Sequence, residues 1–378
     1  MVNVSRREVI ASLLAATAGV GAGVGGTLGA QATVASPAAH PQPDTATSAA
    51  VDPTGRTQAG ITRPATPQPF GLVTIATLKS LDLGWLRGLG AGILGVAGSE
   101  RSILLPDGPG DVTVTVGLGP RLVASVDPTL SAAEPLPLFA KDEAIDSSRL
   151  GGDLLLAIYA SNPTILLGVR DHLLEQVPHA TVAWSQHCFR GPGTGMIARN
   201  PLGFRDGVIV PHGEGELNDA VWIDDGPFAG GTVCVIRRLV LNVQGFGELD
   251  LDAQQRTIGR AKLDGAPLSG GAPDSEVNLT AKTESGEYLV PAHSHVRRAH
   301  PSFTGSALML RRGYAFDDGD GDGGLLFMCY QRDLHAFVAT QTRLDEGDDL
   351  MAYARPTASA SFVILPGFDE TNPLGSRL

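Results

Sequence analysis

Two short segments of the chain place a charged side chain beside glycine. Residues 203–207 read Gly-Phe-Arg-Asp-Gly, and the glycines around Asp206 either let the backbone approach a ligand closely or form an ordinary Asp-Gly turn. Residues 310–314 read Leu-Arg-Arg-Gly-Tyr, so Arg311 ends an apolar run, either in a site or at a surface edge. A carboxylate can act as a general acid or base, and an arginine supplies a permanent positive charge. Each segment alone is compatible with chemistry or with ordinary structure.

Three histidines lie in the segment 291–301, which reads Pro-Ala-His-Ser-His-Val-Arg-Arg-Ala-His-Pro. His293 and His295 have the i, i+2 spacing that suits one face of a strand. Together with His300 they could bind a metal ion or lie solvated in a loop. A non-haem metal site would need an acidic ligand as well, and none is evident nearby. The spacing therefore leaves both interpretations open.

The elements that must position these residues alternate between strands and helices. In the first half, apolar runs and helical spacing predict the order β-α-β-β-α-β, at 70–78, 78–89, 112–116, 153–159, 162–177 and 181–184. The second half repeats this order more loosely, with strands at 232–243, 307–310, 325–330 and 361–365 and a helix at 334–344. This is the split βαβ pattern. We therefore expect an α+β protein with antiparallel sheets and two ferredoxin-like domains, at 66–205 and 206–378.

A fourth segment completes a recognisable series. Residues 257–268 read Thr-Ile-Gly-Arg-Ala-Lys, then Leu-Asp, then Gly-Ala-Pro-Leu. Together with the Gly-x-x-Asp-Gly element, the Ser-His-hydrophobic-Arg segment that begins at Ser294 and the Arg-Arg-Gly-Tyr element, it resembles the dye-decolorizing peroxidase family. The resemblance is closest to the twin-arginine-exported, deferrochelatase-like branch, and it covers nearly all of the chain from Gln58 to Gly367.

The resemblance implies a haem-dependent peroxidase that uses hydrogen peroxide to oxidise bulky organic or dye-like reductants. It implies non-covalent haem b in the C-terminal domain, with His295 as the proximal iron ligand. Asp206 would transfer a proton and Arg311 would stabilise the developing negative charge. The positions that match haem-lining stretches of the family are Gly207, Val208, Ile209, His300, Pro301, Ser302 and Arg311. Candidates for carrying electrons to a bulky reductant are Trp184, Trp222, Tyr314 and Tyr330, although core packing is their ordinary role.

Several positions depart from the family pattern. Val208-Ile209-Val210 replaces a polar Thr-x-Asn stretch, and His300 replaces an asparagine, where we expect it to bind a haem propionate. The family usually places an acidic residue near the last strand to hydrogen-bond the proximal histidine, and the matching position here is Ala352; Glu346, Asp348 or Asp349 could substitute. These departures motivate an alternative function, an exported haem carrier or a deferrochelatase-like protein that releases iron from haem and has weak peroxidase activity.

The N-terminus has the features of an export signal. Arg6 and Arg7 precede a weakly hydrophobic, Gly-rich stretch that is a poor transmembrane helix. We expect a twin-arginine signal peptide at 1–35, a flexible Pro/Ala/Thr-rich linker at 36–65, and a secreted, periplasmic or cell-envelope protein without stable membrane insertion after cleavage. A membrane anchor or a chance arginine pair is the alternative.

Composition narrows the partners. The formal net charge is −12, and an acidic surface repels phosphate backbones, so no nucleic-acid partner is expected. The three cysteines form no CxxCH element, which argues against covalent haem; they are expected to be buried, with one disulfide as the alternative. The acidic loop 317–323 lacks the glutamate of an EF-hand at its twelfth position, so we expect a solvated loop rather than a calcium site. The sequence is compatible with a homo-oligomer.

Overall fold

The computed structural model describes residues 49–98 and 101–378. The predicted signal peptide and the first part of the predicted linker lie outside these residues. The described residues form one compact unit. Within the described ranges, no helix has the length and apolar character needed to cross a membrane.

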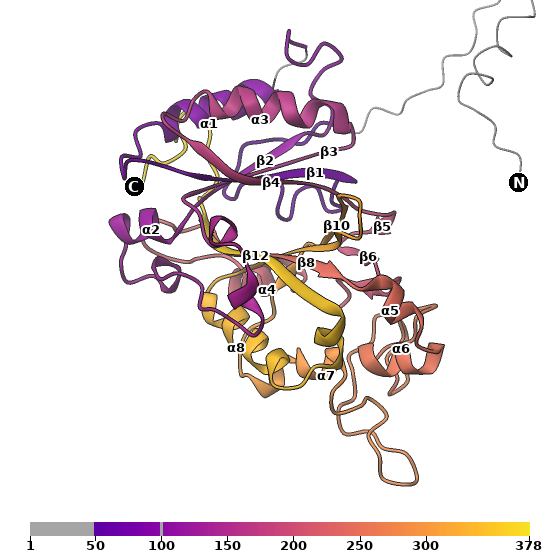
Figure 1. Ribbon diagram of the computed structural model, residues 1–378. Helices are drawn as coiled ribbons and strands as arrows, with labels where there is room; N and C mark the ends of the chain where they lie inside the picture. The colour runs from indigo at the N-terminus through magenta and orange to yellow at the C-terminus, as the bar shows by residue number, and fades with distance from the viewer. Residues whose placement is uncertain (1–48, 99–100) are drawn as a thin grey trace, which may run out of the picture. The chain divides into compact units, whose positions relative to one another are not determined.

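The first half forms a four-stranded antiparallel sheet in the order β4-β1-β3-β2, which is the order of a ferredoxin-like unit. The three inner strands consist almost entirely of buried residues, as their apolar runs predict. Helices α1 and α3 cover one face of this sheet (Figure 1). The elements are β1 (Phe70–Thr77), α1 (Leu86–Gly98), β2 (Thr113–Leu118), α2 (Pro120–Val126), β3 (Leu154–Ala160), α3 (Leu166–Leu174) and β4 (Thr181–Phe189).

The second half repeats the arrangement. Its strands follow the order β12-β8-β11, and both β9 and β10 pair with the far edge of β11. The elements are α4 (Gly213–Ala220), β8 (Thr232–Leu241), α5 (Val243–Gly247), α6 (Leu251–Ile258), α7 (His295–Arg298), β9 (Leu310–Arg311), β10 (Tyr314–Asp317), β11 (Gly323–Gln331), α8 (Leu334–Asp345) and β12 (Ala354–Ile364). Single 3-10 turns lie at Ser131–Ala133, Asp142–Ala144, Ser147–Arg149, Pro163–Ile165, Pro301–Phe303 and Asp349–Tyr353.

The two sheets join at both edges. Strand β12 pairs with β2, and β10 pairs with β4 as well as with β11. Eight strands therefore close into a ring, β10-β4-β1-β3-β2-β12-β8-β11, whose inward side chains form a shared core. The prediction of two ferredoxin-like halves is confirmed, and the closure of the ring makes them one body.

Two predicted boundaries are wrong. The boundary between residues 205 and 206 falls inside β7 (Arg205–Asp206), which pairs with β6 (Ile197–Arg199) in a small sheet that also holds β5 (Gly193–Thr194). The predicted linker ends too late, because Gln58 is 1% exposed and its amide bonds the backbone of Val116 in β2 and of Leu365, the residue after β12. In the sequence, a polar residue that closes the seam between two strands cannot be distinguished from the polar residues of a linker.

Buried groups elsewhere refine the expectations. All three cysteines are free and buried, which confirms the first interpretation and removes the disulfide. The four candidate electron carriers are at most 6% exposed, so they pack in the core rather than meet a bulky reductant at the surface. The acidic loop is not simply solvated, because Asp318 and Asp322 both form ion pairs with the buried Arg238, at 3.0 Å and 2.8 Å.

Candidate active site

Asp206 lies at the end of β7, in a backbone conformation that requires glycine next to it. Gly207 has a φ of +80°, and a Cβ at this position would lie 2.2 Å from the carbonyl oxygen of Met196. The Gly207 N–H donates a 2.6 Å hydrogen bond to Asp206 Oδ1, which holds the carboxylate in place. The Gly-x-x-Asp-Gly element is therefore a positioned carboxylate rather than an ordinary turn.

Arg311 faces this carboxylate from β9. Its Nε lies 3.3 Å from Asp206 Oδ1, and its Nη1 donates a 3.0 Å hydrogen bond to the carbonyl of Ile209. Burial alone would raise the pKa of Asp206, but the charge of Arg311 and the Gly207 N–H outweigh it and hold this pKa below its usual value. Asp206 is therefore ionised at neutral pH.

His295 is the first residue of the short helix α7, and Asp348 holds its ring. Nδ1 lies 2.6 Å from Asp348 Oδ2, and the Asp348 side chain is fully buried. Burial disfavours the protonated imidazole, yet the charge and hydrogen bond of Asp348 outweigh this effect and raise the pKa of His295. Because an ionised carboxylate can only accept, Nδ1 carries the proton that faces Asp348, and in the neutral imidazole the free lone pair is on Nε2.

The acidic partner of His295 was not at the expected position. Ala352 cannot hydrogen-bond through its side chain, and of the three suggested substitutes the structure selects Asp348. The Leu350 N–H donates to the other oxygen of Asp348 at 2.9 Å, so this residue also caps the turn Asp349–Tyr353. The cap therefore holds the carboxylate in place independently of its contact with the imidazole.

The fourth sequence segment positions α7. Gly259 ends α6 with a φ of +98°, and a Cβ there would lie 2.3 Å from Val296 Cγ2. The next residue, Arg260, binds three backbone carbonyls of the loop that follows, those of Gly265, Pro273 and Ser275. This segment therefore supplies close packing behind the histidine rather than a reacting group.

Three of the predicted site residues lie near one another. The charges of His295, Asp206 and Arg311 interact, and their side chains are 33%, 30% and 27% accessible, so each remains open to a ligand. An imidazole nitrogen and an ion-paired carboxylate are the groups that a haem iron and its peroxide need, so the residues fit haem.

The remaining predicted residues divide into two groups. Gly207 and Ile209 contact the Asp206–Arg311 pair directly, and Val208 is buried.

His300 already has two polar partners, because its Nε2 lies 2.8 Å from Glu276 and its Nδ1 lies 2.8 Å from Ser302. Pro301 and Ser302 begin the turn that follows. His293 and His295 do not share the face of a strand, because α7 begins at His295, while His293 hydrogen-bonds the carbonyl of Gly347.

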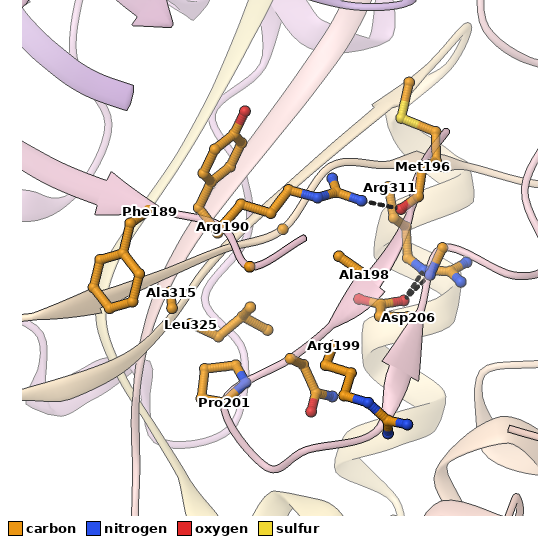
Figure 2. Close-up of a pocket in the computed structure, with 15 residues that line it drawn as sticks. Phe189, Arg190, Met196, Ala198, Arg199, Pro201, Asp206, Arg311, Ala315 and Leu325 are labelled. Atoms are coloured by element: carbon orange, nitrogen blue, oxygen red, sulfur yellow. Dashed lines mark hydrogen bonds and ion pairs between the residues drawn. The ribbon is translucent and has the colours of Figure 1, made fainter. Parts of the chain in front are cut away.

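Asp206 and Arg311 line a hollow with about 380 Å³ of empty space, which includes open solvent. Figure 2 shows apolar side chains at one end, including Phe189 and Leu325, and the Asp206–Arg311 pair at the other. Arg190 extends between them and donates a hydrogen bond to the carbonyl of Met196. Sequence reasoning missed Arg190, because it follows a strand in no motif.

Comparisons with known proteins agree with this arrangement. Residues 197–369 match the C-terminal model of the Dyp-type peroxidases. The chain is 35% identical over 300 residues to a dye-decolorizing peroxidase of Thermobifida fusca, covering 71% of this chain and 68% of that protein. It is 31% identical to a deferrochelatase of Escherichia coli, covering 83% of this chain and 74% of that one.

The fold agrees as well. The crystal structure of a DyP-type peroxidase from Streptomyces coelicolor matches with a TM-score of 0.80 and 32% identity, over 88% of this chain and 97% of the other. The sequence relatives and this structure support the same conclusion as the four ordered motifs. The chain belongs to the Dyp-type peroxidases, a family of haem enzymes.

Proposed function

We propose that this protein is a haem peroxidase that uses hydrogen peroxide to oxidise an organic reductant, with His295 as the proximal ligand and Asp206 and Arg311 on the distal side. One observation carries the proposal: the fold brings His295, Asp206 and Arg311 close enough for their charges to interact, although the chain separates His295 from Asp206 by 89 residues. When bound, haem supplies the iron at which peroxide binds and the electrons that cleave its O–O bond.

The chain's own residues would move the proton and stabilise the charge. Asp206 accepts the proton of the inner peroxide oxygen and delivers it to the outer oxygen, which leaves as water. Arg311 stabilises the negative charge that develops on that leaving oxygen and keeps Asp206 ionised between turnovers. Asp348 keeps the Nδ1 proton of His295 in place, so that Nε2 presents its lone pair and becomes more basic.

Two variants on the distal side and one on the proximal side test these roles. The haem-loaded protein is mixed with one equivalent of hydrogen peroxide, and the decay of its Soret band is followed by stopped flow. Asp206→Ala and Arg311→Ala should retain the resting Soret band and react more slowly, while His295→Ala should lose or shift that band. A parent protein whose Soret band is only bleached by peroxide, without oxidation of a reductant, would contradict the peroxidase proposal.

A second candidate function rests on the 31% identity to the E. coli deferrochelatase. The same haem site could release iron and leave the porphyrin intact. Anaerobic incubation of the haem-loaded protein with a reductant distinguishes the two, because iron release gives the fluorescence of iron-free porphyrin and peroxidase chemistry does not.

We also propose that the protein is exported through the twin-arginine pathway. The support is Arg6-Arg7 followed by a weakly hydrophobic stretch in the sequence. Fusion of residues 1–35 to a reporter in a host with and without the twin-arginine translocase tests this: export should require the translocase, and Arg6→Lys with Arg7→Lys should abolish it.

A further inference from the structure

The guanidinium group of Arg190 forms no ion pair with a carboxylate in the described part of the chain. It is half-buried, and its hydrogen-bond acceptor is the Met196 carbonyl. Burial is the largest effect on the pKa of Arg190 and lowers it; Arg312 lowers it further, whereas Tyr314 and Asp206 act in the opposite direction. Because Asp206 is ion-paired with Arg311, it balances only part of the desolvated charge of Arg190, so the site favours an anion.

The surroundings increase this positive charge. Arg312 is fully buried, and its donors reach the Ile61 carbonyl, the Gln68 amide oxygen and the Tyr314 hydroxyl, all neutral acceptors. Asp206, the carboxylate that lines the hollow, is already paired with Arg311. The interior around the hollow thus carries an excess of positive charge in a protein whose net charge is −12.

The other arginine of the hollow is not available for a ligand. Arg199 donates to three backbone carbonyls, those of Gly203, Lys262 and Leu263, at 2.6 Å to 2.8 Å. Its donors hold the loop before Asp206 in place. Arg190, by contrast, directs its guanidinium along the hollow with most of its N–H groups uncommitted (Figure 2).

The end of the hollow opposite the ion pair is apolar. Phe189 is 46% exposed there, which is unusual for a phenylalanine, and Leu325, Ala315 and Pro201 lie beside it (Figure 2). The hollow is partly open to solvent, and an apolar wall beside a few polar groups is the lining that fixes ligands in small-molecule sites.

We propose that this hollow binds a small aromatic carboxylate, with the carboxylate on Arg190 and the ring against Phe189 and Leu325. The proposal rests on the proposed peroxidase function, since it names the class of reductant that reaches the distal side directly. A phenol that carries a carboxylate would give up its electron and phenolic proton there, with peroxide as the final acceptor of both. For a reductant of this size, the buried Trp and Tyr residues need not transfer electrons to the protein surface.

Isothermal titration calorimetry of the haem-loaded protein tests the binding without any turnover. The probes are benzoate and benzamide, which have nearly the same shape and differ in charge. Benzoate should bind at least about tenfold more tightly, a difference of about 1.4 kcal/mol. Its affinity should fall with added salt, whereas that of benzamide should not.

Variants assign the binding to Arg190. Arg190→Gln should lower benzoate affinity about tenfold and leave benzamide unchanged, and Arg190→Lys should restore most of the loss. Arg87→Gln, on the exposed outer helix α1, removes the same charge elsewhere and should change neither affinity. Phe189→Ala should weaken benzoate and benzamide alike.

The outcomes separate this inference from the proposed function. Equal affinities of the parent for benzoate and benzamide would overturn the inference, as would unchanged benzoate binding in Arg190→Gln, which would indicate direct ligation of the iron. If either occurs while peroxide still drives oxidation of a reductant, the peroxidase proposal stands. Charge-dependent benzoate binding in a protein that peroxide only bleaches would contradict the peroxidase proposal instead.

Discussion

The buried ion pair between Arg237 and Asp142 should be one of the most sensitive points of the fold. Asp142 precedes β3 in the first half of the chain, and Arg237 lies on β8 in the second, so the pair joins the two halves. The Arg237 Nη1 and Nη2 atoms lie 2.6 Å and 2.7 Å from the two carboxylate oxygens, and the side chains are 3% and 0% exposed. Ser359 Oγ accepts a further bond from Nη1 at 3.0 Å.

Asp142→Asn removes the charge and keeps the volume. The guanidinium would then remain buried without a counter-charge, a loss that costs about 3–5 kcal/mol in comparable buried pairs. For a chain of this size each kcal/mol lowers Tm by about 2 °C, so we expect a decrease of about 6–10 °C. Replacing both residues by apolar ones, Asp142→Leu with Arg237→Met, should recover much of the loss because no charge is then buried.

Urea unfolding of the haem-loaded protein, followed by circular dichroism, measures the change. The matched control is Asp224→Asn, the same substitution in the exposed pair of Asp224 with Arg332, whose side chains are 64% and 35% accessible. Exposed pairs contribute about 0–1 kcal/mol, so this variant should differ little from the parent. If Asp142→Asn were no more destabilised than Asp224→Asn, the reasoning that the pair joins the two halves would be wrong.

Three further predictions concern the site. Arg311→Gln should raise the pKa of Asp206, because burial then acts against ionisation without the opposing guanidinium. The reaction with peroxide needs the ionised carboxylate, so as the pH is lowered its rate should begin to fall at a higher pH than in the parent. An unchanged acidic limb of the pH–rate profile would argue against Asp206 as the proton acceptor. Asp348→Asn should make the imidazole of His295 less basic and raise the reduction potential of the bound haem, measured by spectroelectrochemistry, whereas Asp349→Asn should leave it unchanged. Gly207→Ala should lower Tm and slow the reaction with peroxide, because its Cβ would collide with a backbone carbonyl 2.2 Å away; full stability would show that the backbone can shift.

Much of the molecule follows from local sequence patterns. The buried strands Phe70–Thr77 and Thr232–Leu241 were predicted nearly to the residue, because a run of apolar residues reports that both faces of a strand are covered. Helix α1 was predicted too early, since its Gly-rich sequence weakens the helical signal, and the buried face begins only at Leu86. The motifs around Asp206, His295 and Arg311 were recognisable because their residue types and order recur along the chain of a known family.

Other features depended on contacts between distant segments. Glu346, Asp348 and Asp349 are equivalent in the sequence, and only the turn that ends α8 directs Asp348 at His295. The seam closed by Gln58 and the ring closed by β10 depend on which strand edges meet, and hydrophobic periodicity reports burial of a face but not the partner of an edge. Arg190 becomes informative only when the fold removes it from water without bringing a described carboxylate into ion-pair contact. The sequence by itself thus determined the family, the strands and the chemical groups, while the tertiary structure decided which groups face one another, because pairing and desolvation arise only after the chain has packed.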